Sequence, residues 1–217
     1  MTTLVVFNGD VDREFLVSQL VVSGPVVAAD GAARAVLEAG GSCDVLVGDM
    51  DSIDQSDLTE LRAVNPELDV RMFPSEKDAT DGELALRVAL ESDPDRIVVV
   101  GAFGGNRLDH EFANIFLLAN EDWRDRDVVL VDPTRRISLL TNRTEINGVP
   151  GDVVTLIPFG GGVTGVSSEG LRYELNNQDL VVGTSLGVSN ELIGVVATIV
   201  VATGMLLVVH EGQRATD

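Results

Sequence analysis

The sequence predicts an α/β domain followed by an all-β domain. Over the first 140 residues, short apolar runs alternate with helix-like segments, and after that point the helical pattern disappears. Most of the early runs are apolar on both faces, which is typical of parallel strands covered on both sides. We therefore expect an open, mostly parallel sheet with helices on both faces in residues 1–140, and a β-sandwich in residues 141–217.

The elements of the first domain follow in regular order. The expected strands span residues 4–9, 26–30, 44–49, 70–74, 96–102 and 127–133. The expected helices lie between them, near residues 12–21, 31–39, 55–64, 78–90 and 108–120. Right-handed crossovers join such units, and ligands bind beyond the carboxyl ends of the strands.

The second half consists of strand-like runs separated by turn signals. The expected breaks lie at residues 158–162, 169–170 and 176–177. The uncharged run from Leu192 to Val209 has the length of a short membrane span. Its β-branched residues and glycines favour two buried strands that turn at residues 202–204 over a membrane helix.

The composition excludes several classes of protein. The net charge is −20, and such a surface repels a polyanion, so broad binding of nucleic acid is excluded. A hydrophobic content of 45% excludes a disordered chain. Acidity of this extent, with Lys77 as the only lysine, suggests a halophilic protein, because strong salt screens the mutual repulsion of the carboxylates.

The single cysteine and the N-terminal segment favour a cytoplasmic protein. Cys43 cannot form an internal disulfide, which fits a reducing compartment. The segment MTTLVVFNGD lacks the basic region and cleavage pattern of a signal peptide.

Polar residues cluster directly after four of the expected strands. These clusters are Asp30-Gly31, Gly48-Asp49-Met50-Asp51-Ser52, Lys77-Asp78-Ala79-Thr80-Asp81 and Gly104-Gly105-Asn106-Arg107-Leu108-Asp109-His110. The carboxyl ends of parallel strands meet at one edge of a sheet, so the four clusters are expected to converge there.

The aspartates of these clusters suggest a site for a hard cation. Asp49 and Asp51 point the same way from a strand end and can share one ion, although a solvated loop with a helix cap explains them equally well. Asp78 and Asp81 can share one face of the helix expected there. Capping by Asp78 or Thr80 is compatible with metal binding.

The cations and glycines of the clusters suggest phosphate binding. Lys77 is retained in a chain that otherwise avoids lysine, and Arg107 offers a fork suited to phosphate oxygens. Both lie near an expected helix start, whose free N–H groups favour an anion. His110 is expected to orient Asp109 or to bond within the fold, with Asn114 as a partner. No P-loop, kinase catalytic loop or nucleophile elbow is present, so this inventory fits metal-assisted phosphoryl transfer.

Together these motifs resemble the thiamine pyrophosphokinase (thiamine diphosphokinase) family. The resemblance rests on Ala29-Asp30-Gly31, GDxDS at residues 48–52, KDxTD at residues 77–81, Arg107-Leu108-Asp109-His110 with Asn114, and Ser189-Asn190-Glu191. It implies transfer of pyrophosphate from ATP to the hydroxyl of thiamine, which yields thiamine diphosphate and AMP. It also implies a catalytic first domain that binds ATP and Mg²⁺, a thiamine-binding and dimerising second domain, and a homodimer with active sites at the interface.

The resemblance also implies roles for individual residues. Asp49, Asp51, Asp78 and Asp81 would form the catalytic and Mg²⁺-binding cluster. The nucleotide would be contacted by Asp30, Lys77, Thr80, Arg107, Asp109 and His110. Ser189, Asn190 and Glu191 would help to form the thiamine pocket. Either Asp81 or Asp109 is expected to accept the proton of the thiamine hydroxyl.

Three positions depart from the family pattern: Ala32 follows Asp30-Gly31, Met50 replaces an aromatic residue, and Asn106 stands in the glycine loop. Two alternatives remain open. A related pyrophosphokinase could act on a hydroxymethylpterin, which the Ser189-Asn190-Glu191 motif disfavours. A non-catalytic sensor of nucleotide or thiamine diphosphate is disfavoured by the retained acidic positions and Lys77.

Overall fold

The fold was obtained as a computed structural model, and it describes residues 1–212. The chain divides into two compact units, Met1–Asp132 and Pro133–Asp217. The boundary therefore comes earlier than the expected one after residue 140. The reason is that strand β7 (Arg135–Leu140) pairs with strand β13 (Thr203–Glu211) of the second unit.

The first unit contains the expected parallel sheet. Its strands are arranged in the order β4 (Asp69–Met72), β3 (Val45–Gly48), β2 (Val26–Ala29), β1 (Thr2–Val6), β5 (Arg96–Val100) and β6 (Val128–Val131). Every pair of neighbours among these six strands is parallel. The α/β prediction is confirmed.

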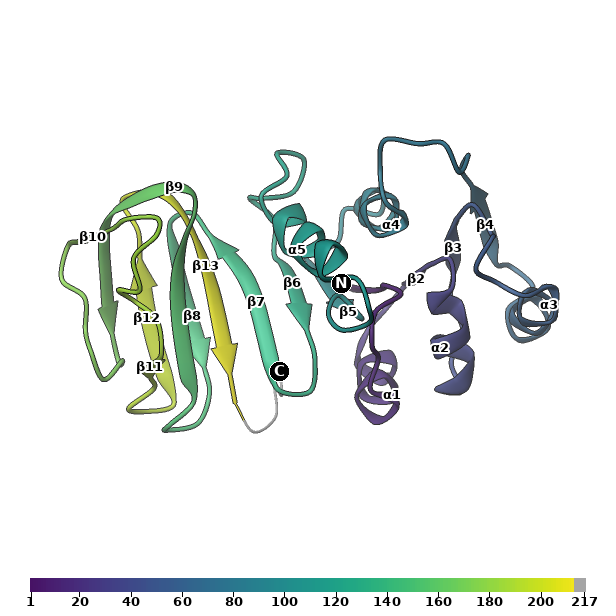
Figure 1. The fold of residues 1–217 in the computed structure, drawn as a ribbon. Coiled ribbons are helices and arrows are strands. Elements are labelled where there is room, and N and C mark those ends of the chain that lie inside the picture. Colours follow the sequence, from purple (N-terminus) through teal and green to yellow (C-terminus); the bar gives the residue numbers. More distant parts are fainter. Residues whose placement is uncertain (213–217) are drawn as a thin grey trace. The chain divides into compact units, whose positions relative to one another are not determined.

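Helices cover both faces of this sheet (Figure 1). They are α1 (Arg13–Val22), α2 (Ala32–Glu38), α3 (Gln55–Val64), α4 (Asp81–Leu90) and α5 (Leu108–Leu117). Alternate strand residues such as Leu4 and Val6 form one core cluster with Leu16 of α1, Val36 of α2 and Leu61 of α3. Helix α4 packs against β1, β2 and β3 through its own buried side chains, and α5 lies beside α4.

The strand order places a crevice at a defined point of the sheet. The chain starts at β1, proceeds outward through β2, β3 and β4, and then returns to β5 on the other side of β1. Strand order thus reverses between β1 and β5, and open α/β sheets bind ligands beyond the carboxyl ends of their strands at this kind of reversal.

The second unit is built from antiparallel strands. Their order is β7, β13, β9 (Val153–Glu169), β12 (Val196–Val200) and β8 (Arg143–Asn147), with β10 (Gln178–Leu180) and β11 (Asn190–Glu191) also paired to β9. Apolar side chains of these strands enclose a separate core that includes Leu156, Val166, Ile199 and Leu206. The strand-rich character expected for this half is confirmed.

The expected break at residues 158–162 is wrong. Strand β9 runs through this segment without interruption, because its pairing with β13 shifts register there. Phe159 pairs with Met205 and Thr164 pairs with Thr203, so the extra residues of β9, which include the glycines, form an irregular bulge. Gly160 has a φ of 71°, a conformation that favours glycine, at this bend.

The uncharged run from Leu192 to Val209 forms strands β12 and β13, as the sequence predicts. The two strands are separated by Val201 and Ala202, so the connection comes earlier than the expected turn at residues 202–204, and Thr203 and Gly204 belong to β13. Within residues 1–212, no helix combines the length and the apolar character required to cross a membrane.

Candidate active site

A cavity of about 460 Å³ lies in the first unit at the carboxyl ends of its strands. Its lining comes from the segments that follow β1, β2, β3, β4 and β5 and from the starts of α4 and α5. The predicted site residues that line it are Asp30, Asp49, Lys77, Thr80, Asp81, Arg107 and His110. The expected convergence of strand-end clusters is therefore observed.

Three carboxylates lie close enough together to hold one metal ion. Oxygen atoms of Asp30, Asp49 and Asp51 all fall within 4.8 Å of one another. Gly48 permits this approach, since a methyl group on Gly48 would lie 2.7 Å from Cβ of Asp30 and 3.3 Å from Oδ1 of Asp81. The set shares Asp49 and Asp51 with the expected metal ligands, lacks Asp78 and Asp81, and adds Asp30, which was expected to contact the nucleotide.

Asp30 has the environment of a metal ligand. Asp30 is only 3% exposed. Its Oδ2 accepts a hydrogen bond from the Ser52 N–H at 3.1 Å, whereas its buried Oδ1 has no hydrogen-bond partner. Burial raises the pKa of Asp30, the hydrogen bonds from Ser52 oppose this, and the charges of Asp81 and Asp51 add to it. A buried, unpartnered carboxylate oxygen beside two further carboxylates fits Mg²⁺, which prefers oxygen ligands.

Asp49 is held in its ionised form by its neighbours. Hydrogen bonds from Ser75 and from the backbone of Asp51, together with the charge of Lys77, keep the pKa of Asp49 below its ordinary value against the effect of burial. Asp51 in turn accepts a hydrogen bond of 2.8 Å from the Ser52 hydroxyl. Ser52 thus orients both Asp30 and Asp51, which gives the serine of the GDxDS motif a physical role.

Lys77 connects two of the aspartates. Its Nζ lies 2.9 Å from Oδ1 of Asp81 and 3.6 Å from Oδ2 of Asp49. Burial lowers the pKa of Lys77, but the hydrogen bonds and charges of Asp81 and Asp49 outweigh it, so the pKa lies above its usual value. Lys77 is therefore a charged group in the lining of the cavity.

The sequence predicts a helix from residue 78, but the KDxTD segment is helical only from Asp81 onward. Helix α4 begins at Asp81, because the Thr80 hydroxyl accepts a hydrogen bond from the Glu83 N–H and caps the helix. Asp78 precedes the helix in an exposed loop and does not share a helix face with Asp81. It does not line the cavity.

Arg107 and Asp109 form a pair at the rim of the cavity. The guanidinium donates two hydrogen bonds to the carboxylate, from Nε at 2.9 Å and from an NH2 nitrogen at 2.6 Å. Both side chains are 65% exposed. The pair holds the pKa of Asp109 at about 2, so this carboxylate is a weak base. Arg107 lines the cavity and Asp109 does not.

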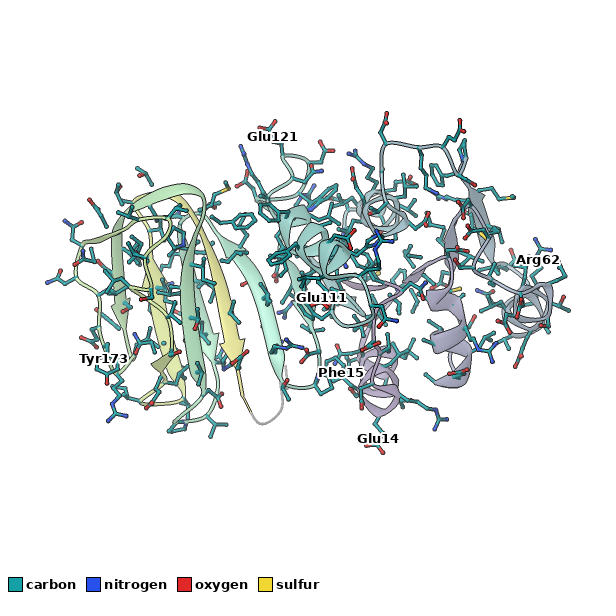
Figure 2. All side chains as sticks on the ribbon, viewed as in Figure 1. Glu14, Phe15, Arg62, Glu111, Glu121 and Tyr173 are labelled. Carbon is teal, nitrogen blue, oxygen red and sulfur yellow. The ribbon has the colours of Figure 1, made fainter. Side chains whose placement is uncertain are left out.

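Helix α5 is fixed to the sheet in a way that the sequence did not suggest. The Asn114 amide donates to the carbonyl of Ala102 at 2.8 Å, which ties α5 to the segment after β5. The expected hydrogen bond between Asn114 and His110 is absent from the described structure. His110 is exposed and lines the cavity together with Glu111, which extends from the first turn of α5 (Figure 2).

Sequence reasoning missed Asn8, which lies after the central strand β1 and lines the cavity. A methyl group on Gly31 would lie 2.9 Å from the Asn8 amide nitrogen, so Gly31 leaves room for this side chain. The signal was present in the sequence, since Asn8-Gly9 directly follows an apolar strand. It was missed because Asn-Gly is also a common turn.

The residues predicted to bind thiamine belong to the second unit. Asn190 is 4% exposed, and its amide bonds to both backbone groups of Tyr173 and to the N–H of Glu191. Glu191 pairs with Arg172 at 2.8 Å. Ser189 is exposed in a left-handed conformation, with its N–H donating to Thr155. Asn190 thereby fixes the exposed Tyr173 segment (Figure 2).

Cys43 takes no part in this chemistry. Burial and the charge of Asp44 raise the pKa of its thiol to about 12, so the thiol does not ionise at neutral pH. The site thus contains carboxylates suited to a metal, two cations suited to phosphates and no activated thiol. Fold and site together define the class of the protein as an α/β phosphoryl-group transferase.

Comparison with known proteins identifies the family. The model described as "Thiamin pyrophosphokinase, catalytic domain" matches residues 20–130, and "Thiamin pyrophosphokinase, vitamin B1 binding domain" matches residues 141–206. The chain belongs to the thiamin pyrophosphokinase family.

Individual relatives agree with this assignment. Thiamine pyrophosphokinase of Bacillus subtilis (strain 168) is 33% identical over 180 residues, which covers 78% of this chain and 77% of that protein. Thiamine pyrophosphokinase 1 of Oryza sativa subsp. japonica is 30% identical over 160 residues, or 68% of this chain and 58% of that protein. The crystal structure of thiamin pyrophosphokinase from Geobacillus thermodenitrificans has a TM-score of 0.83 and 30% identity, with 98% of each chain covered.

Proposed function

We propose that this protein transfers a pyrophosphate group from ATP to the hydroxyl of thiamine, giving thiamine diphosphate and AMP. The observation that carries the proposal is the cavity at the strand-order reversal, whose lining includes Asp30, Asp49, Lys77 and Arg107. Carboxylates for a metal and cations for phosphates are the groups that this reaction requires. Family membership supports thiamine as the acceptor.

Asp30, Asp49 and Asp51 are the residues that we propose as holders of Mg²⁺. The unpartnered Oδ1 of Asp30 supports this choice over a purely structural cluster. When bound there, Mg²⁺ would neutralise phosphate charge and favour departure of AMP. Lys77 and Arg107 would contact phosphate oxygens, and the fork of Arg107 can do so after it exchanges Asp109 for phosphate.

The residues that contact the nucleotide and the residue that acts as the base are proposals with different support. Thr80 and His110 line the cavity and can contact the nucleotide, whereas Asp78 and Asp109 do not line it. Asp81 is the base that we propose, because it lines the cavity and the pKa of Asp109 is held too low for that role.

We also propose a cytoplasmic homodimer in which the second unit, with Ser189, Asn190 and Glu191, binds thiamine. The support for a dimer lies in helix α5, none of whose residues is buried in the single chain. Leu108, Phe112 and Phe116 recur at every fourth position and are 65%, 55% and 59% exposed. An exposed apolar stripe of this kind is typical of a surface covered by a partner.

The activity can be tested by measuring AMP. The purified protein is incubated with ATP and MgCl₂, and with thiamine, 6-hydroxymethylpterin or no acceptor. We expect AMP and thiamine diphosphate only with thiamine. AMP formation with the pterin alone would assign the protein to a related pyrophosphokinase, and its absence with either acceptor would favour a sensor.

Matched variants test whether the proposed site carries this reaction. Asp49→Asn removes one charge from the cluster and should abolish AMP formation while the fold is retained. Asp125→Asn removes the same charge at an exposed position and should leave the rate unchanged. Equal rates in the two variants would contradict the assignment of the site.

A further inference from the structure

Lys77 is enclosed to an extent that is unusual for a lysine. Its side chain is 15% exposed, whereas the side chain of Arg87, which also pairs with acids around α4, is 46% exposed. Lysine carries a compact and strongly hydrated charge, so its partial burial needs compensation by other charges. The only lysine of the chain thus lies largely enclosed beside two carboxylates.

The ammonium of Lys77 bridges two separate parts of the site. Asp49 follows β3, while Asp81 opens α4, and Nζ of Lys77 lies 3.6 Å from the first and 2.9 Å from the second. The carboxylate side chain of Asp49 is only 13% exposed. Without the ammonium, Asp49 and Asp81 would present two uncompensated negative charges to each other in the lining of the cavity.

The charges of this cluster do not balance. Asp30, Asp49, Asp51 and Asp81 lie within electrostatic reach of one another, and Lys77 contacts two of them, Asp49 and Asp81. The buried Oδ1 of Asp30 has no hydrogen-bond partner, which independently indicates that the cluster is built for a further cation. A metal ion that enters would have to share Asp49 with the ammonium and would be repelled by it.

We propose that Lys77 is a tethered counter-ion that holds the empty cluster together and weakens its binding of free divalent metal. The inference rests on the proposed function in one respect, because that function identifies the ligand that draws Lys77 away from the carboxylates as a nucleotide. The phosphates of a nucleotide bring enough negative charge to attract both the metal and the ammonium. Lys77 would then turn from the carboxylates to the phosphates, and metal would enter preferentially together with nucleotide.

The proposal can be tested with Mg²⁺ alone. Binding of MgCl₂ is measured by calorimetry, and by the thermal midpoint after removal of metal with EDTA, for the wild type and for Lys77→Met. We expect Lys77→Met to have a lower midpoint without metal and to bind Mg²⁺ about tenfold more tightly. Lys77→Arg keeps the charge and should bind Mg²⁺ as weakly as the wild type.

Arg87→Met is the matched control, because it also removes one positive charge. Like Lys77, Arg87 pairs with an acidic residue four positions away in the chain, in this case Glu83. This variant should leave Mg²⁺ affinity unchanged, since Arg87 contacts Glu83 and Asp122 rather than the cluster. Mg²⁺ binding by Lys77→Met that is equal to or weaker than that of the wild type would overturn the proposal. If Lys77→Met shows no cooperative unfolding, Lys77→Gln is judged by the same criterion.

A nucleotide arm separates this proposal from the proposed function. With Mg²⁺ and a non-hydrolysable ATP analogue, Lys77→Met should bind the analogue more weakly than the wild type does. If the wild type forms no AMP from ATP and thiamine, yet Lys77→Met still binds free Mg²⁺ more tightly, the activity is refuted and the counter-ion role stands. If AMP is formed but free Mg²⁺ affinity does not increase, only the counter-ion role is refuted.

Discussion

Among residues 1–212, Asp30 is the acidic side chain that the fold buries. It has a φ of 38°, a strained conformation for a residue with a side chain, and it follows the buried strand β2. Ser52 orients one of its oxygens and leaves the other without a partner. A strained, buried carboxylate destabilises the fold unless a cation compensates it, which is why we assign Asp30 to the metal rather than to the nucleotide.

Asp30→Asn tests this assignment through stability and activity together. The pKa of Asp30 is raised above its ordinary value of 3.8 in the folded state, so ionised Asp30 disfavours folding at neutral pH. We expect the metal-free variant to unfold at the same temperature as the wild type or higher at pH 7.5. Any gain in the unfolding temperature of the variant over the wild type should vanish as the pH falls toward 3.8, because protonated Asp30 is neutral like asparagine.

The same variant should lose activity. Changes to groups that merely orient a metal ligand cost about 10–100-fold, so we expect AMP formation to fall by more than about 100-fold. Thermal unfolding in EDTA and initial rates in MgCl₂ provide the two measurements. A variant that is clearly less stable at pH 7.5 but fully active would show that Asp30 serves the fold and not the metal.

The sequence largely predicts which residues line the cavity, but it does not predict which of their side chains face each other. Asp49, Lys77 and Arg107 follow strands, and strand ends converge at one edge, so their proximity follows from topology. Which carboxylates face each other depends on loop conformations such as the left-handed Met50, with a φ of 64°. Sequence periodicity carries no signal for such a torsion, so the proximity of Asp30 to Asp49 and Asp51 could not be predicted.

At the scale of elements, the segments after β1 and β5 support the cavity as one unit. The N–H of Gly9 donates to the carbonyl of Gly101 at 2.9 Å, and the N–H of Asp10 donates to that of Phe103 at 2.8 Å. A methyl group on Gly9 would lie 2.4 Å from both carbonyl oxygens. These two segments carry Asn8 and the glycine loop that line the cavity, so their separation controls its shape.

Gly9→Ala should therefore impair both stability and function. The added methyl group has to push the two segments apart, and such overpacking typically costs about 1–3 kcal/mol. We expect a lower free energy of unfolding in urea and a higher KM for ATP. Gly161→Ala is the control, because a methyl group on Gly161 would meet no atom within 4 Å. If the two variants behave alike, the contact between the segments does not shape the cavity.

Element types were predictable in the first unit because apolar strands and helical periods differ in length and pattern. Boundaries depended on single hydrogen bonds, as at Thr80, which starts α4 at Asp81 and leaves Asp78 outside. Strand β9 was not predictable as one element. Pro158 and the glycines after it normally end a strand, and here the register shift against β13 keeps them within it.

At the scale of the whole molecule, the charge of −20 and the exposed apolar stripe on α5 oppose each other. Burial of Leu108, Phe112 and Phe116 against a second copy would favour a dimer. Two copies with this charge repel one another at low ionic strength. We infer that the acidic surface makes such an assembly dependent on salt.

Sedimentation at several protein concentrations tests this coupling. The Debye length falls from about 10 Å at 0.1 M salt to about 3 Å at 1 M, so repulsion between two copies is largely screened at the higher concentration. We expect the dissociation constant of the dimer to fall several-fold from 0.1 M to 1 M KCl. Phe112→Glu should remain monomeric at both concentrations, because it introduces a charge into the apolar stripe.

Val64→Glu adds the same charge at an exposed position at the end of α3 and should associate like the wild type. A dimer that weakens with salt would show that charge pairs rather than apolar burial hold it together. A dimer that persists in Phe112→Glu would place the interface elsewhere. Because the single chain buries no residue of α5, burial of this helix against a second copy would also fix the first turn of α5, with His110 and Glu111, beside the cavity.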